Sequence, residues 1–422
     1  MRKVLLAAVI GYLLIANAQA ANPPLLPTTP EKAGFSSEAL TRIDAFFDRE
    51  IQAGRIPGAV IGIARDGKLV TLKAYGYRDK DKGLKMEVDS IFGLASMTKP
   101  QVAVGVLALT QRGLLPLNSP LASYFPAVAD MKVAIPVADG SLSYEAQKQP
   151  ITIQNLLRHT SGMTYGGRPD SSSPVANLYP SGNTLAALPS SQAFMDKITK
   201  LPLVYQPGTV WEYSVSFDVL AAVTEKVSGK KMSEYLGETI WKPLGMVDTG
   251  FHIDPAKRDR VARPLPNDPL TGKPQHIGVI EEPVNFECGG GCSVGTVPDY
   301  LRFGQMLLNG GSLDGKRVLS PEMVKLMTSN HLSASIKNNV ANVELHLAGY
   351  GFGLGVAVRV EPGIAAVPAS PGEFTWNGAY GTGFWVDPQQ RLVVVFGTAA
   401  PGEIRKYYRE QVQDLVYGAM TR

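Results

Sequence analysis

The side chains best suited to chemistry in this sequence are Ser96 and Lys99, three residues apart at the start of an apolar stretch. Pro100 fits the first turn of a helix, and Gly113 is a typical residue at which a helix stops, so we predict a helix over about 101–112. Positions three apart lie on the same helix face. Burial disfavours a lysine's charge and lowers its pKa, which makes the amine a base for a neighbouring hydroxyl. The spacing therefore predicts a nucleophilic serine activated by a lysine.

Such a pair also needs a proton donor for the leaving group, and Tyr213 is the candidate. It precedes a predicted helix, 216–228, whose apolar stripe indicates burial. A phenol near a cationic lysine has its phenolate stabilised and can transfer protons. Taken alone, a tyrosine at such a place is more often a packing residue. His159 is another candidate base, which we interpret as a structural histidine that holds a loop.

Composition restricts the class of protein. The 422 residues are 45% hydrophobic and 18% charged, which is typical of a globular chain with a large core. A net charge of +4 without a basic block excludes nucleic acid as an expected partner. The five histidines are scattered, so we expect neither metal nor cofactor. Cys288 and Cys292 flank three glycines, and the sequence leaves open whether they form a disulfide.

Residues 1–20 have the form of a cleavable signal peptide. A basic start at Arg2 and Lys3 precedes an apolar run and a small-residue site ending at Ala20. The run is too short to span a bilayer comfortably, and no later stretch reaches 18 apolar residues. We expect cleavage near Ala20, a periplasmic or secreted protein, and no stable membrane association. The oligomeric state cannot be predicted from the sequence.

Strand patterns gather at the two ends of the chain. Near the N-terminus, a predicted helix at 38–53 is followed by a hairpin around Asp66-Gly67. Near the C-terminus, strand-like runs at 382–386 and 391–396 precede a predicted helix at 403–419. The pattern predicts an α/β (α+β) fold, with one antiparallel sheet built from both termini and flanked by helices.

The middle of the chain has a different character. Helices are predicted near 101–112, 153–158, 216–228, 233–242 and 297–309. Segments rich in Pro, Gly and Asn separate them at 125–150, 163–190 and 252–287, and we expect these to be loops that wall a site. We therefore predict a single hydrolase domain over 21–422. Its α/β lobe is expected at about 21–95 and 320–422, its inserted helical lobe at about 96–319, and Ser96 at their junction.

Five motifs in order resemble those of the serine β-lactamase and penicillin-binding protein superfamily, most closely its family VIII carboxylesterases. They are Ser96-Met-Thr-Lys99, Leu156-Leu-Arg-His-Thr-Ser-Gly162, Tyr213-Ser-Val215, the glycine-rich segment 289–296 with Asp299 after it, and Trp376-Asn-Gly378. The resemblance implies a β-lactamase/transpeptidase-like fold with Ser96 as nucleophile and Lys99 and Tyr213 as base and acid. It also implies an oxyanion hole from the backbone N–H groups of Ser96 and Ala379, with Trp376 and Gly378 beside the substrate.

Two departures from the β-lactamase pattern bear on the substrate. Val215 stands where those enzymes have an asparagine, and Trp376 stands where they have a lysine that attracts a carboxylate. Losing that cation removes a contact worth roughly 1.5–3 kcal/mol. We therefore expect a carboxylesterase for short neutral esters, with weak cephalosporin hydrolysis as a side activity. A β-lactamase or D-amino-acid peptidase is the alternative, and a non-catalytic penicillin-binding sensor is an alternative of another class.

A rival nucleophile is Ser293, because Gly291-Cys-Ser-Val-Gly295 matches the nucleophile elbow of α/β-hydrolases. That elbow requires a strand leading directly into the serine and a helix leaving at once. Here glycines precede the serine, and the next helix is predicted to start at Thr296, with Asp299 completing a cap. We interpret Ser293 as part of a glycine-rich turn that borders the cleft.

Overall fold

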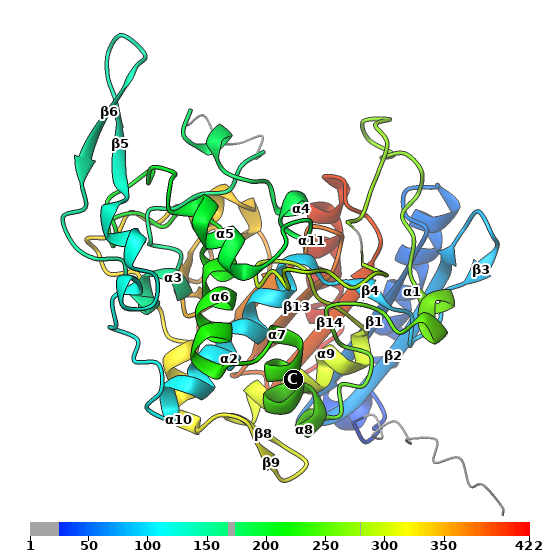
Figure 1. Cartoon of the computed structure of the whole chain (residues 1–422). Helices are drawn as coiled ribbons and strands as arrows, with labels where there is room; N and C mark the ends of the chain where they lie inside the picture. Colours follow the sequence, from blue (N-terminus) through cyan, green and yellow to red (C-terminus); the bar gives the residue numbers. More distant parts are fainter. Residues whose placement is uncertain (1–24, 168–173, 279) are drawn as a thin grey trace, which may run out of the picture.

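The computed structural model describes residues 25–167, 174–278 and 280–422, so the expected signal peptide at 1–20 lies outside the described residues. An eight-stranded antiparallel sheet forms the centre, in the order β10-β11-β12-β13-β14-β1-β2-β3 (Figure 1). Its strands are β1 (Gly58–Arg65), β2 (Lys68–Asp79), β3 (Leu84–Lys85), β10 (Tyr350–Phe352), β11 (Ala357–Arg359), β12 (Phe374–Asn377), β13 (Gly383–Asp387) and β14 (Leu392–Thr398). Strand β1 pairs with β14, with Ile61 opposite Phe396. The predicted sheet built from both ends of the chain is confirmed.

Helices cover both faces of this sheet because successive strand residues point to opposite sides. On one face, Ile61 and Val394 pack in a cluster with α1 (Ser37–Gln52) and α11 (Ile404–Tyr417). On the other face, Val60 and its neighbours join the larger core that contains α9 (Val297–Leu308). The hairpin between β1 and β2 turns at Asp66 and Gly67, whose φ angles of 51° and 74° suit a tight two-residue turn.

The middle of the chain folds mainly into helices. They are α2 (Thr98–Gln111), α3 (Ile153–Leu157), α4 (Gly182–Leu185), α5 (Ser191–Ile198), α6 (Ser216–Ser228), α7 (Met232–Leu236), α8 (Lys242–Leu244) and α10 (Pro321–Met327). Helix α2 is buried along nearly its whole length, from Thr98 to Leu109. The Tyr235 hydroxyl on α7 donates to the backbone carbonyl of Gly105 at 2.8 Å. A helix apolar on all sides must be surrounded by other elements, as predicted for this stretch.

Two predictions for this region are corrected by the structure. The helix predicted at 233–242 is divided, since a π-helical turn, Gly237–Trp241, separates α7 from α8. The segment 125–150 is not only loop, because β5 (Lys132–Pro136) and β6 (Leu142–Ala146) form a hairpin that projects from the molecule (Figure 1). Its turn contains Asp139-Gly140, with Gly140 at φ 83°. An Asp-Gly pair is a sequence signal for a hairpin turn, so this hairpin could have been predicted. No helix in the described ranges is long and apolar enough to cross a membrane.

Candidate active site

Ser96 lies at a sharp turn between a short strand and helix α2. Strand β4 (Phe92–Gly93) pairs with β7 (Val294–Gly295), and a single 3-10 turn, Ala95–Met97, then leads into the helix. Ala95 has φ 45°, which is unusual for a residue other than glycine and is typical of positions held by their surroundings at functional sites. This turn places Ser96 beside a cavity while its helix stays in the core.

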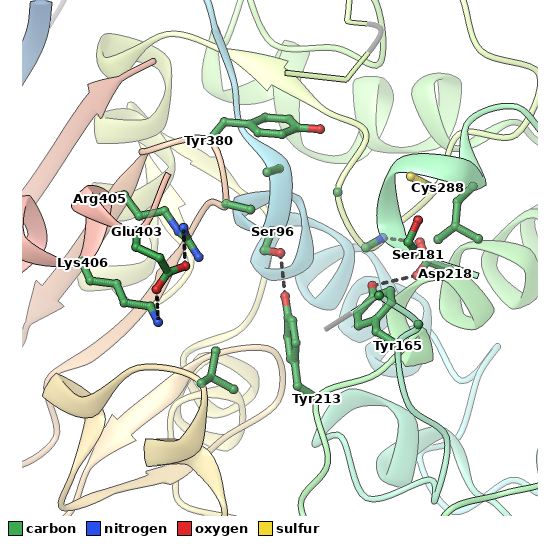
Figure 2. A pocket seen from close by; sticks show the side chains of 18 of the residues that line it. Ser96, Tyr165, Ser181, Tyr213, Asp218, Cys288, Tyr380, Glu403, Arg405 and Lys406 are labelled. Carbon is green, nitrogen blue, oxygen red and sulfur yellow. Dashed lines mark hydrogen bonds and ion pairs between the residues drawn. The ribbon is translucent and has the colours of Figure 1, made fainter. Parts of the chain in front are cut away.

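The structure brings Ser96, Lys99 and Tyr213 together. The Tyr213 hydroxyl donates to the Ser96 hydroxyl oxygen at 2.6 Å (Figure 2), and Lys99 Nζ donates to the same oxygen at 3.1 Å. Lys99 is only 1% exposed, and its Nζ lies 4.5 Å from the centre of the Tyr213 ring. A nucleophile with two proton-transfer groups in hydrogen-bond reach is the arrangement that nucleophilic catalysis requires.

Lys99 is held over Ser96 by a buried network that the sequence did not indicate. Its Nζ donates to the Gly290 carbonyl at 2.6 Å, and the Gly290 N–H donates to Asp218 Oδ1 at 2.8 Å. The Tyr165 hydroxyl donates to the other Asp218 oxygen at 2.9 Å. Burial raises the pKa of Asp218, and the charge of Lys99 opposes that rise. Asp218 therefore holds Gly290 in place, and Gly290 in turn holds Lys99.

That loop is closed by a disulfide between Cys288 and Cys292, whose Cα atoms are 5.3 Å apart. The pairing that the sequence left open is thus formed. Only glycine fits at Gly290, because a Cβ there would lie 2.3 Å from the Tyr165 hydroxyl and 2.6 Å from an Asp218 oxygen. In the sequence, only the run of three glycines indicated that the backbone here lies close to other groups. Nothing about Asp218, in the first turn of α6, indicated that it contacts this loop.

The predicted oxyanion turn follows strand β12. Gly378 donates its N–H to Thr382 O and accepts from Gly381 N–H at 3.0 Å, so it lies in a tight turn. A Cβ on Gly378 would lie 2.4 Å from the Leu94 carbonyl, so the turn packs directly against the chain that leads to Ser96. Gly378 lines neither of the cavities described below, whereas Ala379 lines both. Gly378 therefore serves close packing rather than contact with a ligand.

Ser96 and Tyr213 line a cavity of about 760 Å³. One side is formed by Tyr165, Asp218 and Cys288, and the other by Arg405, Lys406 and Glu403 (Figure 2). A second hollow of about 100 Å³ also reaches Ser96. Trp376 lines only this smaller hollow, is 3% exposed, and has its ring centre 5.4 Å from that of Tyr213.

Arg405 is a cation beside the site that the sequence reading missed. It lines both cavities, and its guanidinium donates to the carbonyls of Pro401 and Gly402 and to Glu403. Glu403 also pairs with Lys406 at 2.7 Å. The predicted helix at 403–419 is present as α11, but nothing in its pattern showed that its first turn faces Ser96. Arg405 therefore supplies a positive charge near the site, which the neutral Trp376 does not.

The two rival residues lie away from the nucleophile. His159 is fully buried among aromatic rings, and its Nδ1 lies 3.1 Å from the Ser214 hydroxyl. Ser293 is 1% exposed, and its Oγ lies 2.6 Å from Thr98 Oγ1, at the start of α2. Ser293 lines neither cavity, so the expectation that it borders the cleft is wrong. It instead anchors the first residue of the helix that carries Lys99.

This fold and this arrangement of side chains define a serine hydrolase with a β-lactamase/transpeptidase-like fold. A family model described as Beta-lactamase matches residues 43–416, and the chain belongs to this family. Protein Rv1367c of Mycobacterium tuberculosis (strain ATCC 25618 / H37Rv) is 34% identical over 361 residues, covering 82% of this chain and 87% of the relative. Esterase EstB of Burkholderia gladioli is 30% identical over 390 residues, covering 87% and 93%. The solved structure of EstCE1, described as a hydrolase with promiscuous acyltransferase activity, is 27% identical with a TM-score of 0.74, covering 90% of this chain and 99% of that chain.

Proposed function

We propose that this protein is a carboxylesterase that hydrolyses carboxylic esters through an acyl-enzyme on Ser96. The observation that carries the proposal is the Ser96 hydroxyl, which receives hydrogen bonds from both Lys99 and Tyr213 beside a cavity of about 760 Å³. A cavity of this volume suits a small organic substrate. The esterase named among the relatives supports the same reaction class.

In acylation, the Ser96 oxygen attacks the ester carbonyl carbon. Lys99 in its neutral form takes the serine proton, while the Ser96 and Ala379 amides stabilise the negative charge on the carbonyl oxygen. Neither amide donates to another atom in the part of the chain that the structure describes. Collapse of the tetrahedral intermediate breaks the ester C–O bond, and Tyr213 delivers a proton to the leaving alkoxide. Lys99 then returns the proton to Tyr213, since Lys99 Nζ and the Tyr213 hydroxyl both lie within hydrogen-bond distance of the Ser96 oxygen.

In deacylation, water attacks the acyl carbon as Ser96 did, and the same two groups move its proton. The Ser96–acyl bond breaks, the serine oxygen recovers a proton, and the carboxylic acid leaves. Tyr213 and Lys99 therefore act in both half-reactions, so loss of either group slows both.

For the substrate, we propose short neutral acyl esters, with cephalosporin hydrolysis as a weak side activity. The support is Trp376, a neutral and bulky residue that lines the hollow next to Ser96. Arg405 already donates to the carbonyls of Pro401 and Gly402 and to Glu403, so a substrate carboxylate would have to compete for its donors.

Hydrolysis of carboxylate-bearing substrates, such as β-lactams or D-amino-acid peptides, is the second candidate. One observation favours it: Arg405 lines both hollows that reach Ser96 and could turn towards a substrate carboxylate. A charge-assisted hydrogen bond of that kind contributes about 1.5–3 kcal/mol. A relative described as a putative D-alanyl-D-alanine carboxypeptidase, from Escherichia coli (strain K12), is 26% identical over 411 residues.

Steady-state kinetics with matched substrates distinguish the two functions. We expect p-nitrophenyl acetate and butyrate to have at least 10²-fold higher kcat/KM than a chromogenic cephalosporin, benzylpenicillin or a D-Ala-D-Ala peptide. The Ser96→Ala variant should lose ester turnover, while Ser293→Ala should retain most of it, because Ser293 lines neither cavity. Faster turnover of a penicillin than of the butyrate ester would replace the esterase by the β-lactamase. A burst of acylation without turnover on any substrate would instead indicate a penicillin-binding sensor.

We also propose that the protein is exported to the periplasm or the medium after cleavage near Ala20. The basic start and apolar run within 1–20 support this proposal. The Cys288–Cys292 disulfide is compatible with an oxidising compartment. N-terminal sequencing of the protein recovered from each fraction tests it, and an intact Met1 on cytoplasmic protein would contradict it.

A further inference from the structure

A buried arginine of helix α11 contacts the turn that carries the Ala379 amide. Arg409 is 4% exposed, and its Nη2 donates to the Gly378 carbonyl at 2.5 Å and more weakly to the Thr382 carbonyl at 3.5 Å. Neither cavity is lined by Arg409, so it does not contact a substrate. Burying a guanidinium is costly unless its charge is paired, so this contact requires an explanation.

The explanation lies in the peptide unit that joins Gly378 to Ala379. A trans peptide is planar, and its C=O and N–H point in opposite directions. Whatever holds the Gly378 carbonyl therefore also sets the direction of the Ala379 N–H. The carbonyl is held by Arg409 and by the Gly381 N–H, while Ala379, the next residue, lines both cavities and Arg409 lines neither. A cation on the carbonyl also polarises the peptide, which makes its N–H a better donor.

We propose that Arg409 is a positioning residue for the oxyanion hole, which aims and polarises the Ala379 N–H through the Gly378 carbonyl. This inference rests on the proposed esterase function. It gives Arg409 an effect on the transition state, where negative charge develops on the carbonyl oxygen, and little effect on binding of the neutral ester.

A carboxylate holds Arg409 in place. Glu344 pairs with Arg409 Nη1 and, through its other oxygen, accepts from the Asn377 side chain at 3.3 Å. His346 lies 3.4 Å from the same carboxylate, and burial lowers the pKa of its imidazole to about 4, so it is neutral near pH 7. Glu344 thus holds both Asn377, the residue before Gly378, and Arg409, which contacts the Gly378 carbonyl.

Arg409 must keep its charge in spite of its burial. Burial lowers the pKa of the Arg409 guanidinium to about 9, which leaves the group charged near pH 7. Glu344 supplies the opposite charge that keeps a buried guanidinium ionised. A fixed positive charge near the site favours the negative charge of the transition state.

The test is the variant Arg409→Met, which keeps the length of the side chain and removes its donors. We expect kcat on p-nitrophenyl butyrate to fall about 10–100-fold, somewhat less than the 10²–10³-fold loss for a deleted oxyanion donor. KM should change by less than about 3-fold. Affinity for an alkyl trifluoromethyl ketone, whose serine adduct carries an oxyanion, should fall by the same factor as kcat. Arg409→Lys, which retains a cation, should recover part of the loss.

Arg359→Met is the matched control. Arg359, in strand β11, is also buried, at 3% exposure, and donates to the carbonyl of Val367 in the segment that follows; neither residue lines a cavity. It should leave kcat and ketone affinity near those of the wild type. Because Arg409→Met leaves Glu344 buried without its partner, the double variant Arg409→Met/Glu344→Gln removes both charges and should show the same kinetic loss if the single variant does not fold.

The outcomes separate this inference from the proposed function. A wild-type protein that neither hydrolyses esters nor binds the ketone would overturn the function and the inference with it. An active wild type whose folded Arg409→Met variant keeps its ketone affinity would overturn the inference alone. A crystal structure of the variant gives a readout besides activity, since the Gly378–Ala379 peptide should rotate. If the Gly378–Ala379 peptide and kcat were both unchanged in Arg409→Met, Arg409 would not be a positioning residue for the oxyanion hole.

Discussion

Replacing Gly290 with alanine should displace Lys99 without changing any reacting group. The new Cβ would lie 2.3 Å from the Tyr165 hydroxyl and 2.6 Å from an Asp218 oxygen. Ordinary contacts begin near 3.4 Å, and Tyr165 and Asp218 are buried and hydrogen-bonded to each other, so they have little room to yield and we expect the loop to move by about 1 Å. The 2.6 Å bond from Lys99 Nζ to the Gly290 carbonyl would then exceed hydrogen-bond distance. A displacement of about 1 Å can cost about 10²-fold in rate, and we expect that loss in kcat.

The neighbouring glycine provides the control. A Cβ on Gly291 would approach no closer than 3.6 Å to Ala95, which is ordinary contact, so Gly291→Ala should stay within a few-fold of the wild type. Both variants are assayed for kcat on p-nitrophenyl butyrate, and circular dichroism and Tm confirm that each is folded. If a folded Gly290→Ala variant kept the wild-type kcat, or if the two variants lost activity equally, Gly290 would not be what positions Lys99.

Three further predictions concern the network, the loop and a buried acid. Lys99→Ala and Tyr213→Phe should each lower kcat by 10²-fold or more, since both groups contact the Ser96 hydroxyl; a near-native rate in either would remove that residue from proton transfer. Reduction of the Cys288–Cys292 disulfide should lower kcat while changing Tm little, because so short a loop contributes little entropy; equal rates before and after thiol treatment would contradict this. Burial raises the pKa of Glu373 to about 8, so its protonated form stabilises the fold below about pH 4.5 and this contribution is lost as the pH rises through about 8. Urea unfolding at pH 5 and pH 8.5 should therefore show a difference of at most about 5 kcal/mol that disappears in Glu373→Gln.

The parts of the fold that the sequence predicted are those with a local signal. The Asp66-Gly67 turn and the apolar runs on either side of it specify a hairpin without reference to the rest of the chain. The all-round apolar character of 101–109 likewise specifies a buried helix, as α2 is. The π-helical turn at Gly237–Trp241 could not be predicted, because the sequence there continues a helical pattern, whereas its contact with α2, where the Trp241 indole donates to the Gln101 side chain at 2.7 Å, forms only in the folded chain.

The residues of the candidate site also fall into two groups, those that the sequence predicts to meet and those that only the fold brings together. Ser96 and Lys99 are close in sequence, so helix geometry alone predicts that they meet. Tyr213 was a candidate mainly through resemblance, because a tyrosine before a helix is ordinary. Asp218 and Gly290 are 72 residues apart and meet only in the folded chain. No periodicity or spacing carries that information, so the support of Lys99 could not be found from the sequence.

Helix α11 shows why the opposite side of the site was also missed. Its residues Arg409 and Gln413 are four apart, a spacing that normally indicates a solvated polar face. In the structure both are buried, at 4% and 6% exposure, and each bonds to a backbone carbonyl, Arg409 to Gly378 and Gln413 to Pro368. A polar stripe and an apolar stripe can thus both face inward when the backbone beside the sheet offers carbonyls that can accept a further hydrogen bond. The sheet then packs against α11 through its apolar residues, while the turn beside Ser96 is fixed by its polar ones. Positioning by a charged hydrogen bond is directional in a way that apolar packing is not, which suits an amide that must point at a single oxygen.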